Sequence, residues 1–207
     1  MKAINMTSTT TMTVTTIQVG QHHLTLIASN PNKKDENSLE IPRLVAVDWQ
    51  PQASLWLDSK SYDKIKKHYC INDNAFEFVD KNSLSKDSAS QALLLSAIAQ
   101  FLAYFIGELQ AFDLPLDISI GTEFQQQVWQ ALQDIPYGET ISYATLARNV
   151  DNPKGYRAVA NANGRNPFSI IIPCHRVIAS DGKLGGYTGG LDNKEYLLAI
   201  EGVRCKP

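Results

Sequence analysis

The sequence is poor in cysteine and has no long apolar run. It contains three cysteines in 207 residues, an odd number, and no apolar stretch of the length that crosses a bilayer. The segment Met1–Thr16 is rich in threonine and has one basic residue, which is unlike a secretory signal, and we interpret it as a frayed tail that leads into a strand. These absences argue against a disulfide framework and a membrane protein. They predict a chain of the reducing cytoplasm with free thiols.

The sequence also has little net charge, −2 at neutral pH, and its acidic residues are unevenly spread. None lies between Asp151 and Asp181. The basic residues of that window are Lys154, Arg157, Arg165 and Arg176. The net charge alone suggests no nucleic-acid partner, but a basic window without acids in a mildly acidic protein predicts a local surface for a polyanion.

The first half of the chain has the pattern of an α/β domain. Runs of β-branched and apolar residues, separated by turn residues, predict strands at 15–19, 24–28, 44–49 and 53–57, the first two as a hairpin. A polar loop is expected at 30–37, and apolar residues at helical spacing predict a helix over 90–109. The pattern breaks at 112–117. We therefore expect an N-terminal structural domain over 1–117 and a C-terminal domain over 118–207, each long enough to bury a core.

The second half of the chain predicts short helices. Apolar residues recur at helical spacing over 124–132. Ser142 can cap the next helix, and after a turn a further helix is expected over 154–163, with Asn152 as its N-cap and Pro153 at its first position. Two short helices joined by a tight turn are typical of a helix-turn-helix motif. Packing of helix against helix explains the same pattern, and the basic window favours DNA.

The sharpest chemical signal is Cys174. It follows the apolar run Ser169–Ile172 and Pro173, which we interpret as a buried strand ended by the proline, and it precedes His175 and Arg176. A cysteine attacks as the thiolate, and a neighbouring His or Arg favours that form. A buried, inert cysteine is the competing interpretation. A cysteine protease fits poorly because its His comes from far away in sequence, and a zinc site fits poorly because no second cysteine lies at ligand spacing.

Neither a metal nor an organic cofactor is expected. The possible metal ligands of the first half do not have a standard ligand spacing; they are His22, His23, His68 and Cys70. The glycine-rich stretch Gly185–Gly190 lacks the Lys-Ser/Thr ending of a P-loop, so it is not predicted to bind phosphate.

A series of short runs in the second half forms a recognisable pattern. The runs are Gly121–Gln125, Ile135–Glu139, Arg157–Val159, Asn166–Pro167, Ile172–Ile178, Gly189–Leu191 and Lys194–Glu195. In order and spacing they resemble the catalytic domain of the O6-alkylguanine-DNA alkyltransferases, the methylated-DNA–protein-cysteine methyltransferases. The resemblance extends from Gly121 to Gly202, about two-fifths of the chain, and its Pro-Cys-His-Arg core is very specific.

The resemblance implies both a fold and a function. The implied fold has an α/β N-terminal domain of the ribonuclease-H-like type and a mostly α C-terminal domain with a winged helix-turn-helix-like DNA-binding motif. The implied function is DNA repair by direct damage reversal, in which the target base is flipped out of duplex DNA. The alkyl group of O6-alkylguanine, and of O4-alkylthymine, then passes irreversibly to Cys174. Each molecule acts once and needs no cofactor.

The resemblance also implies a role for each matching residue. The implied catalytic residues are Cys174 as nucleophile, His175 as a water-bridged general base, Glu201 as its partner and Tyr143 as proton donor to guanine N3. The implied substrate-binding residues are Tyr187, Thr188, Val177 and Asn166. The implied DNA-binding residues are Arg157, which fills the gap left by the flipped nucleotide, with Ala158, Lys154, Arg165 and Tyr143.

Two details complete the expected site. Glu201 lies near the end of a helix that we expect to begin at Asp192, with Glu195 completing a capping box. Thr188 stands where several members of the family have serine, so the hydroxyl is kept and a methyl group is added.

Two other functions fit parts of the sequence. A non-enzymatic binder of alkylated DNA would share the fold and lack the cysteine, whereas Cys174 is present. A helix-turn-helix regulator of the adaptive-response type would have a cysteine-rich regulatory domain, and the sequence has no such cluster. The expected partner is therefore double-stranded DNA with an alkylated guanine, bound by a monomer in the cytoplasm, or at the nucleoid in a prokaryote. The preferred adduct size and cooperative binding along DNA stay open.

Overall fold

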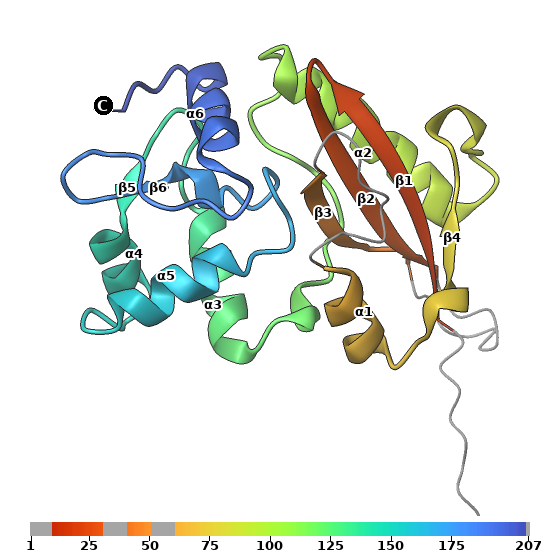
Figure 1. Cartoon of the computed structure of the whole chain (residues 1–207), viewed down its shortest axis with the longest axis horizontal. Helices are drawn as coiled ribbons and strands as arrows, with labels where there is room; N and C mark the ends of the chain where they lie inside the picture. Colours follow the sequence, from red (N-terminus) through yellow and green to blue (C-terminus); the bar gives the residue numbers. More distant parts are fainter. Residues whose placement is uncertain (1–9, 31–40, 51–60, 206–207) are drawn as a thin grey trace, which may run out of the picture. The chain divides into compact units, whose positions relative to one another are not determined.

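The computed structural model describes residues 10–30, 41–50 and 61–205 (Figure 1). The chain divides into two compact units that interleave in sequence. Unit 1 comprises Met1–Ala99 and Leu114–Ile120, and unit 2 comprises Gln100–Asp113 and Gly121–Pro207. A single cut such as 117/118 therefore does not separate the two units.

Unit 1 is built on a four-stranded sheet. Its strands are β1 (Thr11–Val19), β2 (His22–Asn30), β3 (Leu44–Gln50) and β4 (Phe76–Phe78), in the order β3-β2-β1-β4. The first three strands are antiparallel, and β4 pairs with β1 in parallel. The expected hairpin and the strand over 44–49 are confirmed. The expected strand at 53–57, the loop residues 31–37 and the tail residues 1–9 lie outside the described residues.

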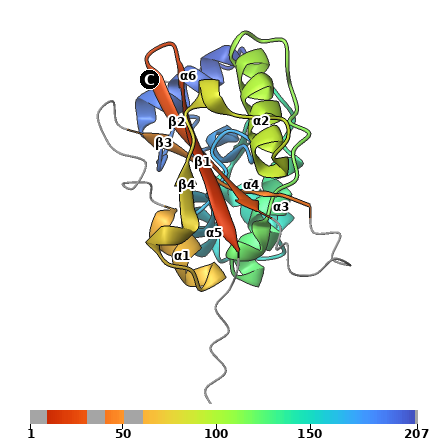
Figure 2. The same ribbon diagram turned by 90° about the vertical axis from the view of Figure 1, so that its right-hand side faces the viewer.

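Helix α2 (Ala89–Phe105) begins in unit 1, where it lies along one face of the sheet, to the right of β1 in Figure 2. The hydroxyls of Ser90 and Thr13 are 2.9 Å apart and join the helix to β1. The helix ends four residues before the expected Leu109, because Gly107 takes a left-handed conformation with φ 79°. The remaining elements of unit 1 are α1 (Tyr62–Tyr69) and the 3-10 turns η2 (Asp73–Ala75), η3 (Lys81–Ser83) and η4 (Ile118–Ile120).

Unit 2 is mostly helical. Its elements are α3 (Glu123–Gln133), β5 (Ile141–Ser142), α4 (Tyr143–Asn149), α5 (Tyr156–Gly164), η5 (Cys174–Arg176), β6 (Val177–Ile178) and α6 (Leu191–Ile200). A capping box between Thr122 and Gln125 starts α3, and Ser142 caps α4 as expected. Trp129 is fully buried and donates its indole N–H to the carbonyl of Ala162 on α5 at 2.9 Å, which joins α3 to α5.

Two expected helix starts are wrong. Helix α5 begins at Tyr156 with Gly155 as N-cap, because Asn152 and Pro153 belong to the turn before it. The N–H of Asn152 is bonded to the carbonyl of Ala147 and so closes the end of α4 instead. Helix α6 begins after Gly190, whose φ of 96° sets the chain direction, and no side-chain capping bond from Asp192 is present.

The expected buried strand over Ser169–Ile172 is also wrong. This segment is a tight turn, in which the N–H of Ile172 bonds to the carbonyl of Phe168 at 3.0 Å. Ile170 has a φ of 74°, a left-handed conformation that a β-branched residue rarely adopts. Buried isoleucines favour a strand in the sequence pattern, but here their burial comes from a strained turn that leads into Cys174.

In the described parts of the chain, no helix is long and apolar enough to span a bilayer.

Candidate active site

Cys174 opens the 3-10 turn η5 and is buried, with 6% of its surface exposed. The N–H of Arg176 closes this turn on the carbonyl of Pro173 at 3.0 Å. Directly after the turn, Val177 begins β6 and pairs with Ile141 of β5. The Pro-Cys-His-Arg sequence thus folds into one compact turn, and its three polar side chains are buried within unit 2.

Asn166 holds the sulfur of Cys174 and the turn before it. Its Nδ2 donates to Cys174 Sγ at 3.2 Å and to the carbonyl of Ile172 at 2.8 Å. Its Oδ1 accepts from the N–H of Phe168 at 2.9 Å. One side chain therefore ties the end of α5 to the cysteine turn, as expected of a residue that positions the thiol.

Burial raises the pKa of the Cys174 thiol. A hydrogen bond from Asn166, the positive charge of Lys194 and a hydrogen bond from Tyr187 oppose this shift without reversing it. In the free protein Cys174 is therefore a thiol and needs a base. The expectation that Arg176 favours the thiolate is wrong, because that guanidinium is bound elsewhere in the site.

Glu201 is the centre of a buried polar cluster at the C-cap of α6, and it is 5% exposed. Its Oε1 accepts from the Tyr104 hydroxyl at 2.6 Å, from His175 Nε2 at 2.9 Å and from Arg176 Nη2 at 2.9 Å. Its Oε2 accepts from Arg176 Nε at 2.9 Å and from the N–H of Gly138 at 3.3 Å. Burial alone would raise the pKa of Glu201, but the hydrogen bonds from His175 and Arg176 lower it to about 2.

The Ile135–Glu139 run surrounds Arg176. The carbonyl of Ile135 accepts from Arg176 Nη1 at 2.6 Å, and the guanidinium lies 5.7 Å from the centre of the Tyr137 ring. Gly138 has a φ of 77°, and a Cβ there would lie 3.1 Å from the carbonyl of Glu201. Glycine is needed at this position because the backbone approaches the carboxylate residue closely.

The cluster determines which nitrogen of His175 carries the proton. Glu201 is ionised at neutral pH and can only accept, so His175 Nε2 donates to it. In the neutral ring, Nδ1 then holds the lone pair, and this buried atom has no hydrogen-bond partner among the described residues. Burial lowers the pKa of His175, and the carboxylate of Glu201 opposes that shift. The arrangement is a neutral imidazole held by a carboxylate, and the lone pair of its basic nitrogen is available to accept a proton.

Lys194 anchors the loop before α6. It is fully buried, and its Nζ donates to the carbonyls of Val177 at 2.7 Å, Leu184, and Gly186 at 3.3 Å. Burial lowers the pKa of Lys194 to about 8, against the opposing effect of Cys174. The same Gly186 carbonyl accepts from the Tyr143 hydroxyl at 3.1 Å. A single buried ammonium thus joins β6 to the loop that Tyr143 also contacts.

The expected substrate residues lie on or beside this loop. The Tyr187 hydroxyl bonds to the Cys174 sulfur and lowers its pKa, and the Thr188 hydroxyl donates to the carbonyl of Gly164 at 2.7 Å. Burial raises the pKa of Tyr143, and a thiolate at Cys174 would raise it further. The structure therefore brings Tyr143 and Tyr187 to the thiol, whereas Thr188 connects the loop to the end of α5.

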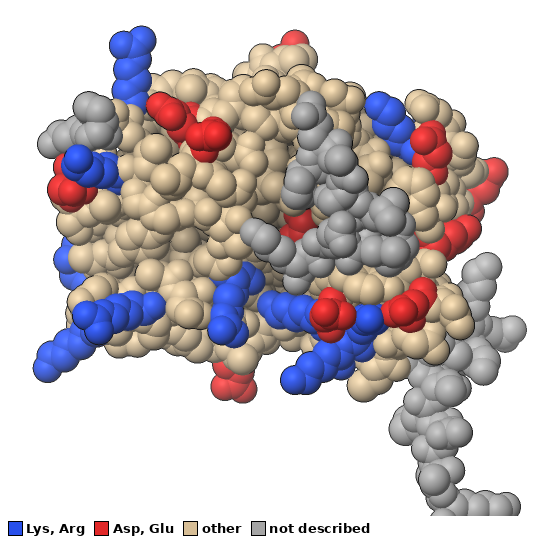
Figure 3. Space-filling model, in the orientation of Figure 1, with Lys and Arg blue, Asp and Glu red and all other residues tan. Residues whose placement is uncertain are grey.

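The expected DNA-binding side chains lie on the exposed side of α5 and its flanking turns. Lys154, Arg157, Ala158 and Arg165 are all exposed. Figure 3 shows Lys and Arg side chains over α4 and α5. Arg157 lies 5.8 Å from the ring of Tyr156, which is 50% exposed. The basic window of the sequence is thus part of the surface and open to a polyanion.

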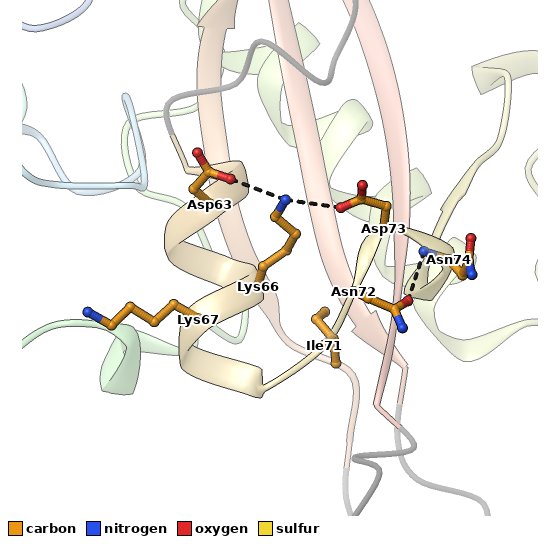
Figure 4. Close-up of a pocket in the computed structure, with 7 residues that line it drawn as sticks. All are labelled: Asp63, Lys66, Lys67, Ile71, Asn72, Asp73 and Asn74. Atoms are coloured by element: carbon orange, nitrogen blue, oxygen red, sulfur yellow. Dashed lines mark hydrogen bonds and ion pairs between the residues drawn. The ribbon is translucent and has the colours of Figure 1, made fainter.

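An open pocket of about 650 Å³ lies in unit 1, and none of the expected site residues lines it (Figure 4). Lys66 bridges Asp63 and Asp73 there at 3.2 and 3.0 Å. No cysteine is among its lining residues, which are Asp63, Lys66, Lys67, Ile71, Asn72, Asp73 and Asn74.

Three of the four possible metal ligands of unit 1 have other contacts. His22 packs edge-on against Trp49, His68 Nε2 lies 3.2 Å from the Ser119 hydroxyl, and Cys70 donates to the carbonyl of Lys67. Among the described residues, no group of three or more His, Cys, Asp or Glu could hold a metal ion.

Sequence reasoning missed two residues of the site, Tyr104 and the buried role of Lys194. Lys194 lies three and four positions before the buried Leu197 and Leu198, so helical spacing could have placed it on the inner face of α6. Tyr104 follows the buried Phe101 by three positions, which indicates burial, but no local pattern reveals its bond to Glu201.

Comparisons with known proteins agree on one family. Residues 123–203 match the family model described as 6-O-methylguanine DNA methyltransferase, DNA binding domain. A methylated-DNA–protein-cysteine methyltransferase of Methanosarcina acetivorans is 58% identical over 106 residues, 51% of this chain and 67% of that protein. One from Mycolicibacterium paratuberculosis is 57% identical over 105 residues, 51% of this chain and 63% of that protein, less than two thirds of its length.

Solved structures extend the likeness to nearly the whole chain. The structure of Mycobacterium tuberculosis OGT in complex with DNA is 34% identical, covers 91% of this chain and 92% of its own, and has a TM-score of 0.64. An O6-methylguanine-DNA methyltransferase from Pyrococcus kodakaraensis is 25% identical over 93% of this chain and 99% of its own, with a TM-score of 0.60. The chain belongs to the O6-alkylguanine-DNA alkyltransferase family, the methylated-DNA–protein-cysteine methyltransferases, which repair DNA by direct reversal through alkyl transfer to a cysteine.

Proposed function

We propose that this chain transfers the alkyl group of O6-alkylguanine, and of O4-alkylthymine, in duplex DNA irreversibly to Cys174. The observation that carries the proposal is the buried thiol bonded by Asn166 and followed directly by the His175–Glu201 pair. A thiol of raised pKa needs a general base, and a neutral imidazole with an open nitrogen is the side chain suited to that task.

In the proposed reaction, the thiol proton passes through a water molecule to His175, and Glu201 stabilises the imidazolium that forms. The sulfur attacks the alkyl carbon, so that a C–S bond forms while the C–O6 bond breaks and its electrons go to guanine. Tyr143 donates its proton to guanine N3, and the base leaves neutral. The Tyr143 phenolate then regains a proton from the His175 imidazolium through water, so the net change converts thiol and alkylguanine into thioether and guanine. Nothing in the reaction converts the thioether back to a thiol, which is why each molecule reacts once.

Helices α4 and α5 form the proposed DNA-binding motif, which we describe as a winged helix-turn-helix with the β5–β6 pair beside it. Arg157 enters the base stack, while Lys154, Ala158 and Arg165 contact the duplex. Tyr187, Thr188, Val177 and Asn166 surround the flipped base. For unit 1 we propose the ribonuclease-H-like description, which its antiparallel β3-β2-β1 order with β4 parallel to β1 supports.

The proposed partner is double-stranded DNA with an alkylated guanine, bound by a monomer. We place the protein in the cytoplasm, at the nucleoid in a prokaryote, where a reducing environment keeps Cys174 as a free thiol.

The decisive experiment is incubation with duplex DNA that has a labelled O6-methyl group. Label should move to Cys174, guanine should be restored, and mass spectrometry should find one alkyl group and no turnover at excess substrate. Cys174→Ala should accept no label, whereas the control Cys70→Ala, which removes an exposed cysteine, should react normally. Normal transfer to the Cys174→Ala variant would contradict the proposal.

The DNA-binding role is tested with Arg157→Ala. Repair of duplex DNA should fall by roughly tenfold or more, because the flipped state loses the side chain that fills its gap and unstacking costs a few kcal/mol. Reaction with free O6-benzylguanine should be unchanged. Arg148→Ala, on α4, controls for the loss of one positive charge. Equal losses on duplex and free base would show that Arg157 does not act in the base stack.

A further inference from the structure

Tyr104 lies near the end of α2, 97 positions before Glu201. It is fully buried, and its ring packs against three aromatic rings of the same unit: Phe105 at 5.6 Å, Phe112 at 5.4 Å and Tyr137 at 6.1 Å. Its hydroxyl is the one polar atom of the side chain and donates to Glu201 Oε1 at 2.6 Å. This contact is the reason that the end of α2 matters to the site.

The oxygen that Tyr104 contacts is the one that holds His175. Glu201 Oε1 accepts from both side chains, at 2.6 and 2.9 Å, while Arg176 binds both oxygens of the carboxylate. Burial and the charge of Glu201 raise the pKa of Tyr104, so its hydroxyl stays protonated and donates throughout the working range of pH. Tyr104 and Arg176 therefore hold the carboxylate from two directions, in addition to its bond with the imidazole.

We propose that Tyr104 is a positioning residue for alkyl transfer, whose buried hydroxyl holds the Glu201 oxygen that orients His175. The proposal rests on the function proposed for Cys174 and deepens it. A hydrogen bond to a carboxylate oxygen draws negative charge from it, so Tyr104 also limits how strongly Glu201 can stabilise the imidazolium. The tyrosine thus acts on the orientation of the base and on its proton affinity.

Replacement of Tyr104 by Phe leaves more negative charge on Glu201 Oε1. The protonated form of His175 gains stability, so its pKa rises and less neutral base is present at a given pH. The other charged groups that act on His175 are Arg176 and Lys194, both of which lower its pKa and stay in place. The rate of alkyl transfer should therefore follow pH with a midpoint shifted upward.

The experiment measures the single-turnover rate of methyl transfer from duplex DNA between pH 5 and 9 for full-length wild type, Tyr104→Phe and Tyr137→Phe. Tyr137→Phe is the matched control, because it removes a tyrosine hydroxyl that bonds to the carbonyl of Ile200 at 3.0 Å and not to the carboxylate. An upward shift of about one pH unit is expected for Tyr104→Phe, with a rate roughly tenfold lower on the acid side. No shift is expected for Tyr137→Phe.

A second readout does not depend on catalysis. Nitrogen NMR of the His175 ring reports its tautomer and pKa directly; wild type should carry the proton on Nε2, and Tyr104→Phe should show the raised pKa. An unchanged midpoint in Tyr104→Phe, or a wild-type ring protonated on Nδ1, overturns the proposal. If wild type transfers no alkyl group, the proposed function fails, and the NMR result still decides the role of Tyr104.

Discussion

The two units bury different kinds of polar side chain. The buried polar residues described in unit 1 are Thr13, Thr15, Thr25, Asp48, Ser61 and Ser90. Those described in unit 2 are Asn163, His175, Arg176, Lys194 and Glu201. Hydroxyl groups dominate the first set and ionisable groups the second. A buried hydroxyl costs far less than a buried charge, which is expensive unless it is paired, so the charges mark the unit where chemistry takes place.

Asp48 is the one buried carboxylate in the unit 1 set, and it too has hydrogen-bond partners. Asp48 accepts from the N–H and the hydroxyl of Ser61, both at 3.1 Å. Its bonds to Ser61 join β3 to the residue before α1, whereas the partners of Glu201 come from three separate segments: Tyr104 of α2, the backbone N–H of Gly138, and His175 with Arg176 of η5. Mutations can test whether this contrast holds in energy as well as in geometry.

The largest effect is expected for Glu201→Gln. It leaves the Arg176 guanidinium buried without its counter-charge, which typically costs about 3–5 kcal/mol of stability. The paired control is Asp48→Asn in unit 1, which replaces the carboxylate that accepts the two bonds from Ser61. Urea unfolding at pH 7 measures both variants. A loss for Glu201→Gln no larger than that for Asp48→Asn would contradict the contrast between the units.

The same carboxylate predicts a pH dependence. The pKa of Glu201 falls from 4.5 to about 2 on folding, so this group contributes about 3 kcal/mol at neutral pH. Because the pKa in the folded protein is depressed, that contribution is fully present above pH 4.5 and is lost as the pH falls towards 2. Glu201→Gln should therefore lose less stability than wild type between these pH values.

A smaller effect is expected for Lys194→Met. The variant leaves the carbonyls of Val177, Leu184 and Gly186 without this donor, at a cost of about 1–3 kcal/mol. The pKa of Lys194 is lowered from 10.5 to about 8, so the unfolded wild type binds more protons between these values and its stability gains from rising pH there. Urea unfolding at pH 8 and 10 should show this gain in wild type and not in Lys194→Met; equal slopes would contradict it.

The smallest effect is expected in the sheet of unit 1. The Thr25 hydroxyl is buried and has no hydrogen-bond partner in the described part of the chain, so Thr25→Val should be neutral or stabilise the protein by up to about 1 kcal/mol. The matched control is Thr13→Val, which removes the contact with Ser90 and should destabilise by about 1 kcal/mol. Thermal unfolding that ranks the two variants in the opposite order would show that these hydroxyls are not as differently placed as the contacts indicate.

Local patterns in the sequence predicted much of the fold. The hairpin of β1 and β2 and the Ser142 cap depend on neighbours within a few residues, and both predictions are confirmed. The prediction of a strand before Cys174 was wrong because an apolar pattern indicates that residues are buried and does not indicate their backbone conformation. Ile170 is buried in a left-handed turn, which its neighbours in the tertiary structure impose.

The part of the site that could be predicted consists of residues that belong to short sequence motifs. Cys174, His175 and Asn166 could be singled out from motifs, and the structure places them together. The proximity of Arg176 in sequence was misleading, since its guanidinium turns to Glu201. Tyr104 could not be found because its partner lies 97 positions away, and only the folded chain brings the two together.

Helix α2 has a consequence for recombination between relatives. Its first eleven residues belong to unit 1 and the rest belong to unit 2, so the boundary between the units at Ala99 falls inside a helix. A chimera that joins the N-terminal half of one homologue to the C-terminal half of another at 117/118 inherits its Tyr104 and its Glu201 from different parents. Crossovers that keep both from one parent should be the ones that survive selection, and a graft of the repair activity should begin within α2.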